Sequence, residues 1–139
     1  MSKENVEVVR RIYAAAASGD SAAVFALYDP GVEWDASRAP MPRLIGGGGI
    51  FHGHDGIREF FQERNTIWDE IEDEPNELIE AGEHVVSADT ERGRGRSSGV
   101  EVEMTQYAVW TIRNGKVVRV VWLPTREEAL EVAGLSDSS

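Results

Sequence analysis

Asp35, His52 and His54 are the side chains whose types and spacing come closest to an acid/base site in this sequence. Asp35 ends the short apolar run Val32 to Asp35. A carboxylate buried there would have a raised pKa and could act as a general base. The alternative is an exposed aspartate at the end of a strand. His54 is the second catalytic candidate, but a histidine at this position can equally serve the start of a helix or face solvent.

The two histidines do not predict a metal site. Only Gly53 separates them, and no third ligand is near in sequence, whereas zinc takes three or four protein ligands. The chain has no cysteine, which removes thiolate ligands, a thiolate nucleophile and disulfides. We therefore expect no metal and no cofactor.

Four further side chains are candidates for contacting a ligand. Trp34 belongs to the first apolar run, and Gln106, Trp110 and Trp122 belong to a Val-rich stretch from Gly99 to Leu123. Gln106 is the strongly polar residue of the predicted inward face and could donate to a ligand carbonyl, although it could also be a satisfied buried amide. The three indoles are predicted to converge, either as the lining of a pocket or as plain core.

The stretch from Gly99 to Leu123 predicts a hairpin, because Asn114-Gly115 separates two β-rich runs. A two-residue loop would place Trp110 opposite Arg119, and a three-residue loop with a bulge would place it opposite Val118. The bulged register separates the two faces more cleanly, and we favour it. Its inward face comprises Val102, Met104, Gln106, Ala108, Trp110, Ile112, Val118, Val120 and Trp122.

The other face of this hairpin carries Tyr107, Val109 and Val121. It is too apolar near the turn to be wholly solvent-exposed, which predicts a homodimer through the outer sheet face. A sheet with one solvated face is the alternative.

Periodicity and turn residues predict the remaining elements. Helices are expected at 2–18, 20–28, 54–68 and 125–134, and strands at 32–35, 77–81 and 84–91. Residues 36–51 should be irregular, and the run Gly46 to Gly49 is either a floppy connection or a mobile flap. Residues 92–99 should form a loop, whose arginines are either solvated or an anion site.

This order predicts an α+β fold in which a curved antiparallel sheet wraps a long helix as a cone. Residues 1–135 are expected to form one domain and 136–139 a frayed tail. The net charge of −11 argues against nucleic-acid and anionic-membrane partners. No signal peptide or membrane-spanning run is evident, so a cytoplasmic location is expected.

The order of short motifs resembles the nuclear transport factor 2-like superfamily, in its SnoaL-like and ketosteroid-isomerase-like branch. The resemblance spans nearly the whole chain. It is carried by Ser18-Gly19-Asp20, Leu27 to Trp34, Phe51-His52-Gly53, Asn114 to Val118, and Glu128 to Leu135. It implies the cone-shaped fold, but this fold hosts isomerases, cyclases, hydrolases and non-catalytic binders.

The resemblance also implies positions for catalytic groups. The ketosteroid-isomerase base falls at Trp34 with Asp35 next to it, the oxyanion tyrosine at Ile12 with Tyr13 next to it, and the oxyanion acid at Ala108. These roles are displaced or lost, so we predict no steroid isomerase. Tyr13 is retained as a ligand-binding candidate.

The limonene-epoxide-hydrolase pattern is also incomplete. Its Arg-x-Asp strand corresponds to Asp89-Thr90-Glu91 without the arginine, and its later aspartate falls near Trp122. Two functions therefore stay open: an acid/base enzyme (isomerase, cyclase or hydrolase type) acting on a small apolar or polyketide-like molecule, or a non-catalytic ligand-binding or assembly module.

Overall fold

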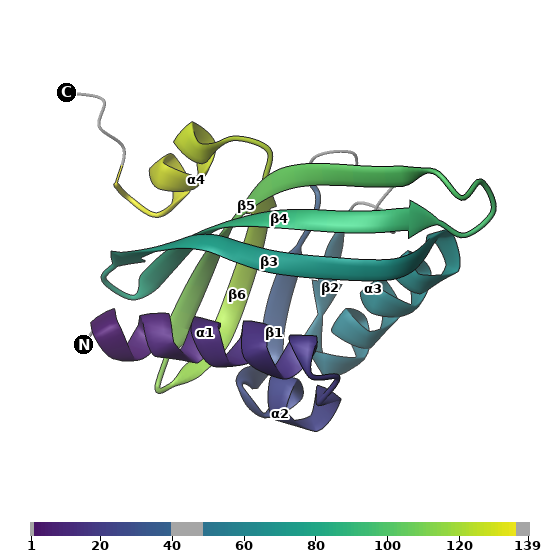
Figure 1. The fold of residues 1–139 in the computed structure, drawn as a ribbon. Helices are drawn as coiled ribbons and strands as arrows, with labels where there is room; N and C mark the ends of the chain where they lie inside the picture. Colours follow the sequence, from purple (N-terminus) through teal and green to yellow (C-terminus); the bar gives the residue numbers. More distant parts are fainter. Residues whose placement is uncertain (1, 40–48, 136–139) are drawn as a thin grey trace.

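The computed structural model describes residues 2–39 and 49–135, so the predictions for Gly46 to Gly48 lie outside the described residues. Figure 1 shows a curved sheet with helices on both of its sides. The helices are α1 (Ser2–Ala17), α2 (Ser21–Ala26), α3 (Gly53–Ile67) and α4 (Arg126–Val132). The strands are β1 (Tyr28–Asp35), β2 (Ile50–His52), β3 (Trp68–Ala81), β4 (His84–Gly95), β5 (Glu101–Arg113) and β6 (Lys116–Leu123).

The helices form where the sequence predicts them. In α1 the buried positions Val8, Val9 and Ile12 follow helical spacing and face the sheet. The side chain of Asp20 caps α2 by accepting from the backbone N–H of Ala23 at 3.1 Å. Helix α3 buries Ile57 and Phe60 on its inner side.

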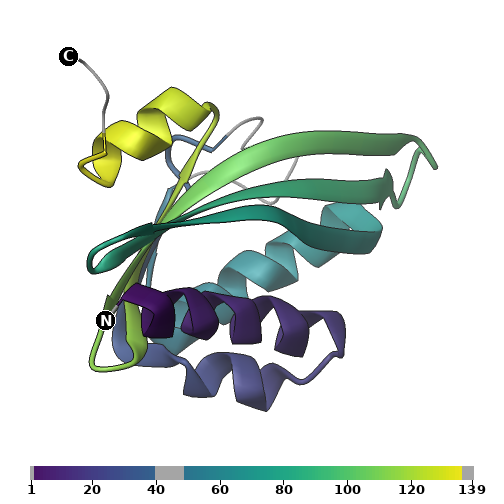
Figure 2. The ribbon, with the colours of Figure 1, turned by 60° about the vertical axis from the view of Figure 1, so that its left-hand side comes forward.

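The sheet has the strand order β2-β1-β6-β5-β4-β3, and Figure 2 shows its curvature over α1 and α3. Every neighbouring pair is antiparallel except β1 with β6, which is parallel. The α+β cone is confirmed, but its sheet is mixed rather than wholly antiparallel. The parallel pair arises because β1 and β6 are far apart in sequence and need no hairpin between them.

Strand β3 is longer than predicted, since it begins at Trp68 and runs through Pro75. The missing N–H of Pro75 is tolerated because β3 is an edge strand and its pairing with β4 shifts between Pro75 and Glu77. The predicted loop at 92–99 is wrong for its first half, because β4 continues to Gly95. Arg92 forms ion pairs with Glu103 of β5 at 2.6 Å and with Glu74 of β3 at 3.3 Å. Carboxylates on both neighbouring strands therefore stabilise its position.

The hairpin closes with the two-residue turn, and the register we favoured is wrong. Arg113 lies opposite Lys116, and Asn114 and Gly115 both have positive φ, at 53° and 75°. The bulge lies within the strand instead, between Thr111 and Ile112, so that Trp110 faces Val120.

Because of this bulge, Val117 takes the inward position that the sequence had predicted for Val118. Val117 is buried, and Val118 is only partly buried. The inward positions from Ala108 to Ile112, together with Val120 and Trp122, remain as predicted.

The outer face of the hairpin is covered by the chain itself. Val109 and Val121 are buried in a second apolar cluster with Ala129 of α4 and with Ala133, the residue that caps its C-terminus. Val109 and Val121, which motivated the dimer prediction, are therefore not exposed on the surface of the chain. None of the helices within 2–39 and 49–135 is long and apolar enough to cross a membrane.

Candidate functional site

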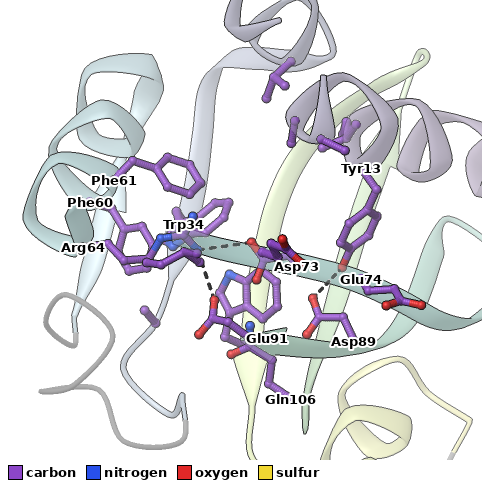
Figure 3. A pocket seen from close by; sticks show the side chains of 18 of the residues that line it. Tyr13, Trp34, Phe60, Phe61, Arg64, Asp73, Glu74, Asp89, Glu91 and Gln106 are labelled. Atoms are coloured by element: carbon purple, nitrogen blue, oxygen red, sulfur yellow. Dashed lines mark hydrogen bonds and ion pairs between the residues drawn. The ribbon is translucent and has the colours of Figure 1, made fainter. Parts of the chain in front are cut away.

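A cavity of about 480 Å³ lies between the concave side of the sheet and helices α1 and α3 (Figure 3). Its lining comes from helices and strands at both ends of the sequence. The lining residues are Ile12, Tyr13, Ala16, Ala17, Val24, Tyr28, Trp34, Ala36, Phe60, Phe61, Arg64, Ile71, Glu72, Asp73, Glu74, Asp89, Glu91, Gln106, Trp110 and Trp122.

One wall of the cavity is aromatic. The rings of Trp34 and Trp122 are 5.5 Å apart, and those of Trp110 and Trp122 are 6.0 Å apart. The predicted convergence of the three indoles is confirmed, and Phe60 packs against Trp34 at 5.2 Å. This wall can bind an apolar or planar group, while the ligand-binding role of each indole stays a prediction.

Another part of the lining is polar because of the alternation along β4. Val85, Ser87, Asp89 and Glu91 share one face of that strand, which becomes more polar toward its end. Asp73 lies opposite Glu91 on β3. Gln106 lies opposite Asp89 on β5, so acidic and amide groups of three adjacent strands meet in the cavity.

Arg64 of α3 joins two of these carboxyl groups. Its Nη1 donates to Asp73 Oδ2 at 3.3 Å and to Glu91 Oε2 at 3.1 Å. The side chains of Arg64, Asp73 and Glu91 are 14%, 29% and 10% exposed. Burial, followed by the charge of Asp73 and a hydrogen bond with it, raises the pKa of Glu91 to about 8, despite the attraction of Arg64.

Asp89 belongs to a second polar group with Tyr13, Ser87 and Trp110. The hydroxyl of Tyr13 donates to Asp89 Oδ2 at 2.9 Å and lies 3.2 Å from Ser87 Oγ, which accepts from Trp110 Nε1 at 2.8 Å. Asp89 is fully buried. Burial and the charge of Asp73 raise the pKa of Asp89 to about 7, against the lowering by hydrogen bonds from Tyr13 and Gln106.

Asp73, Asp89, Glu91 and Arg64 were not among our candidates from the sequence. Asp89 and Glu91 could have been found, because they share the face of Val85 in a strand that was predicted correctly. Asp73 could not, because its segment was not recognised as a strand.

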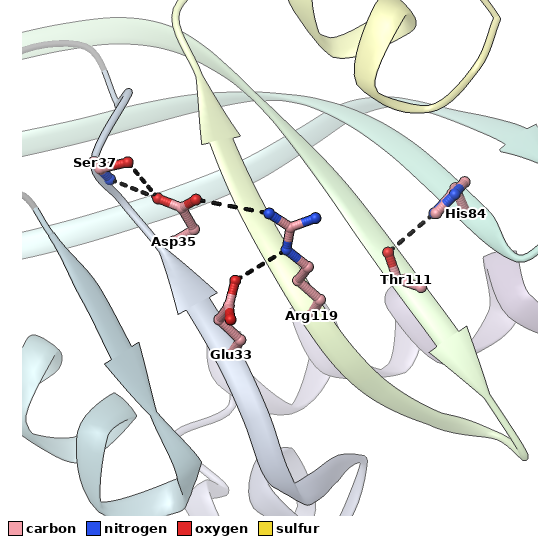
Figure 4. Close-up of polar contacts among 6 residues, drawn as sticks. All are labelled: Glu33, Asp35, Ser37, His84, Thr111 and Arg119. Atoms are coloured by element: carbon pink, nitrogen blue, oxygen red, sulfur yellow. Dashed lines mark hydrogen bonds and ion pairs between the residues drawn. The ribbon is translucent and has the colours of Figure 1, made fainter.

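The two catalytic candidates from the sequence lie outside the cavity lining. Asp35 is buried on the other face of the sheet, where its Oδ1 accepts from the backbone and hydroxyl of Ser37 at 3.0 and 2.6 Å, and Arg119 lies 3.9 Å away (Figure 4). His54 Nε2 lies 2.9 Å from the carbonyl oxygen of Tyr28. The structure therefore separates both groups from the tryptophans, whereas Tyr13 and Gln106 do line the cavity.

The SnoaL-like domain family matches residues 9–120 of this chain. The chain belongs to the SnoaL-like family. Solved structures with this fold carry the nuclear transport factor 2-like and ketosteroid isomerase-like names, which confirms the resemblance seen in the sequence. No curated protein matches the chain.

Three solved structures illustrate how this SnoaL-like chain compares. An NTF2-like protein of unknown function from Burkholderia pseudomallei is 29% identical, with 97% of this chain and 98% of that chain covered and a TM-score of 0.76. TerC, co-crystallised with polyporic acid, is 27% identical, with 94% and 98% covered and a TM-score of 0.75. A candidate polyketide cyclase from Xanthomonas campestris is 17% identical, with 95% and 98% covered and a TM-score of 0.69, and shows the shared fold alone.

Proposed function

We propose that the cavity binds a small, largely apolar molecule and moves protons on it by general acid/base catalysis. The observation that carries this proposal is the pair of carboxyl groups, Asp73 and Glu91, held by one guanidinium beside an aromatic wall. Neighbouring carboxyl groups with separated protonation states can supply an acid and a base at the same pH.

Asp73 and Glu91, the two carboxyl groups that Arg64 holds, take the chemical roles. Glu91 keeps its proton near neutral pH because its pKa is about 8, and it serves as the acid. Asp73, paired with Arg64, serves as the base. Asp89 also lines the cavity and accepts from Tyr13, so in this reaction it contributes to the charge of the cluster and takes no part in the proton transfer.

The reaction class that fits these roles is proton abstraction next to a carbonyl. Asp73 takes the α-proton, the electron pair moves onto the carbonyl oxygen, and Glu91 donates its proton to that oxygen. The resulting enol can be reprotonated elsewhere or can attack a second carbonyl, which are the first steps of an isomerase and of a cyclase. The aromatic wall lowers the local dielectric and so strengthens both interactions.

Deuterium exchange into 1-indanone, a planar aromatic ketone, tests this proposal. We expect the chain to accelerate exchange at the α-carbon in D₂O, as measured by NMR. Asp73→Asn and Glu91→Gln should each lower the rate by about 10²- to 10⁴-fold. The exposed Glu80→Gln on the same strand as Asp73 should leave the rate unchanged.

The pH dependence of this exchange provides a second measurement. Because Glu91 must be protonated, the rate should fall as pH rises through about 8. A rate equal to that of free acetate buffer, or one that Asp73→Asn does not change, would contradict the catalytic proposal.

The alternative is a non-catalytic ligand-binding domain, favoured by the three indoles along one wall. In that case 1-indanone should change the tryptophan emission in a saturable way without exchanging deuterium. Trp122→Ala should remove the emission change. Trp68 lies outside this cavity lining, so the Trp68→Phe variant should still show the change. A homodimer and a cytoplasmic location stay predictions from the sequence.

A further inference from the structure

Six buried side-chain atoms of the cavity lining have no hydrogen-bond partner, and three of them are the donors Trp34 Nε1, Arg64 Nε and Trp122 Nε1. The other three are acceptors, namely Asp73 Oδ1, Asp89 Oδ1 and Gln106 Oε1. They belong to three consecutive strands, because Asp73 lies opposite Glu91 on β4 and Asp89 lies opposite Gln106 on β5. Buried acceptors cost free energy when unpaired, so their clustering in one cavity points to a donor-bearing ligand.

The charged residues of the cavity are mostly acidic. Five carboxyl groups line it, namely those of Glu72, Asp73, Glu74, Asp89 and Glu91, and Arg64 is the basic residue among the lining residues. Arg64 pairs with two of the five, Asp73 and Glu91, and a third, Glu74, pairs with Arg92 from outside the lining. The cavity therefore favours a positive ligand over a negative one.

We propose that the cavity selects a small molecule with a primary ammonium group. Its three N–H donors would meet the unpartnered oxygens of Asp73, Asp89 and Gln106 (Figure 3). Its carbon skeleton would lie against the indoles of Trp34 and Trp122. This inference rests on the proposed function only in taking the cavity as the ligand site, and it does not depend on catalysis.

A primary ammonium fits this site better than the other donors. A hydroxyl offers one donor, and a quaternary ammonium offers charge without any N–H. Metal ions are a poor fit, because the described residues bring together no group of three His, Cys, Asp or Glu that could hold one. Aromatic rings beside the carboxylates also favour an organic cation.

In the ligand-bound cavity, Arg64 and the ammonium group carry the two positive charges. The carboxylates of Asp73 and Asp89 balance these charges, and Glu91 keeps its proton. Asp89 is faced by Tyr13 of α1, Arg64 of α3, Asp73 of β3 and Gln106 of β5, with Glu91 next on β4. The arriving ammonium would therefore displace the proton of Asp89.

Calorimetric titration of the wild-type chain with benzylamine tests this inference. At about pH 6 in two buffers of different ionisation enthalpy, binding should release close to one proton, because Asp89 has a pKa of about 7 before binding. Benzylamine should bind at least about tenfold more tightly than benzyl alcohol or benzyltrimethylammonium, since hydrogen bonds from a charged donor are stronger than those from a neutral one.

Three variants assign the effect to the proposed atoms. Gln106→Leu removes one acceptor without changing a charge, so benzylamine affinity should fall while the proton release is kept. Asp89→Asn should abolish the proton release. Glu80→Gln, outside the cavity lining, should match the wild type in both measurements. Circular dichroism should confirm that each variant is folded.

Equal affinities for benzylamine and benzyltrimethylammonium, or an unchanged affinity in Gln106→Leu, would overturn the ammonium assignment. Tighter binding of phenylacetate than of benzylamine would overturn it as well. Because 1-indanone is neutral and its exchange depends on Asp73 and Glu91 as base and acid, loss of exchange with retained benzylamine binding would contradict catalysis alone.

Discussion

Arg64 is the residue on which the charge state of the cavity depends. One of its nitrogens donates to carboxyl groups on two neighbouring strands, and its Nε has no partner. A single guanidinium cannot neutralise Asp73, Asp89 and Glu91 together. Buried carboxyl groups without a balancing charge keep their protons, which is why the pKa values of Asp89 and Glu91 rise to about 7 and 8.

At the residue scale, Asp89→Asn should remove part of the pH dependence of stability. The pKa of Asp89 is about 7 in the folded chain, against an ordinary value of 3.8, so the folded state binds the extra proton. The free energy of unfolding therefore falls as pH rises between these values, by about 1.4 kcal/mol per pH unit for one proton. The asparagine variant should exceed the wild type in stability at about pH 8 and lose this advantage toward about pH 5.

Denaturant unfolding followed by tryptophan emission at a series of pH values measures this effect. Glu80→Gln, at an exposed position on β3, should follow the wild-type curve. If wild type and Asp89→Asn gave parallel curves, the proton held by Asp89 in the folded chain would be contradicted.

At the scale of elements, the short helix α4 protects a face of the sheet that would otherwise be apolar and exposed. Val86, Val109, Val121 and Leu123 are all buried in its cluster. A helix of seven residues is too short to be stable alone, so its own stability depends on this contact. The N-cap Thr125, which accepts from Glu128 N–H at 3.2 Å, fixes its start directly after β6.

Val109→Glu should destabilise the chain by at least about 3 kcal/mol, because it places a charge beneath α4 without a partner. Thr105→Glu is the matched control. It carries the same charge onto an exposed position of the same face of β5 and should change stability by less than about 0.5 kcal/mol. Thermal unfolding of both variants measures the difference, and an equal effect would show that α4 does not seal this face.

Local sequence signals were sufficient for most elements but not for the site. The helices and the Asn114-Gly115 hairpin depend on neighbours in sequence, such as the buried spacing of α1 and the positive φ values of the turn. The in-strand bulge near Val118 follows from packing between β5 and β6, which alternation alone does not reveal. Pro75 and the acidic run around it concealed β3, because those residues are tolerated only at a sheet edge.

The indoles of the site were predictable, whereas the pairing of its carboxyl groups with Arg64 was not. Apolar alternation placed Trp110 and Trp122 inward. The inward-facing polar residues are Asp73, Asp89 and Glu91. Their interpretation as a site depends on Arg64, which belongs to a helix and pairs with Asp73 and Glu91. Only the assembled fold shows that one guanidinium serves these strands.

At the scale of the whole molecule, the homodimer through the outer sheet face is still open to test. Tyr107 stays partly exposed on this face, and Glu33 pairs with Arg119 there at 3.0 Å (Figure 4). Light scattering after gel filtration should give twice the chain mass, and Tyr107→Ala should shift the chain toward monomers. A monomeric wild type at micromolar concentration would contradict the dimer.

The sheet is open, and its long edge strand β3 leaves one row of backbone groups without a neighbouring strand. That edge is unusually acidic for its 14 residues, which include Asp69, Glu70, Glu72, Asp73, Glu74, Glu77 and Glu80. Two copies aligned edge to edge would bring these rows within about 5 Å of one another, so repulsion between like charges disfavours such pairing. Pro75, which has no backbone N–H to donate, is a second barrier to cross-β growth along this edge.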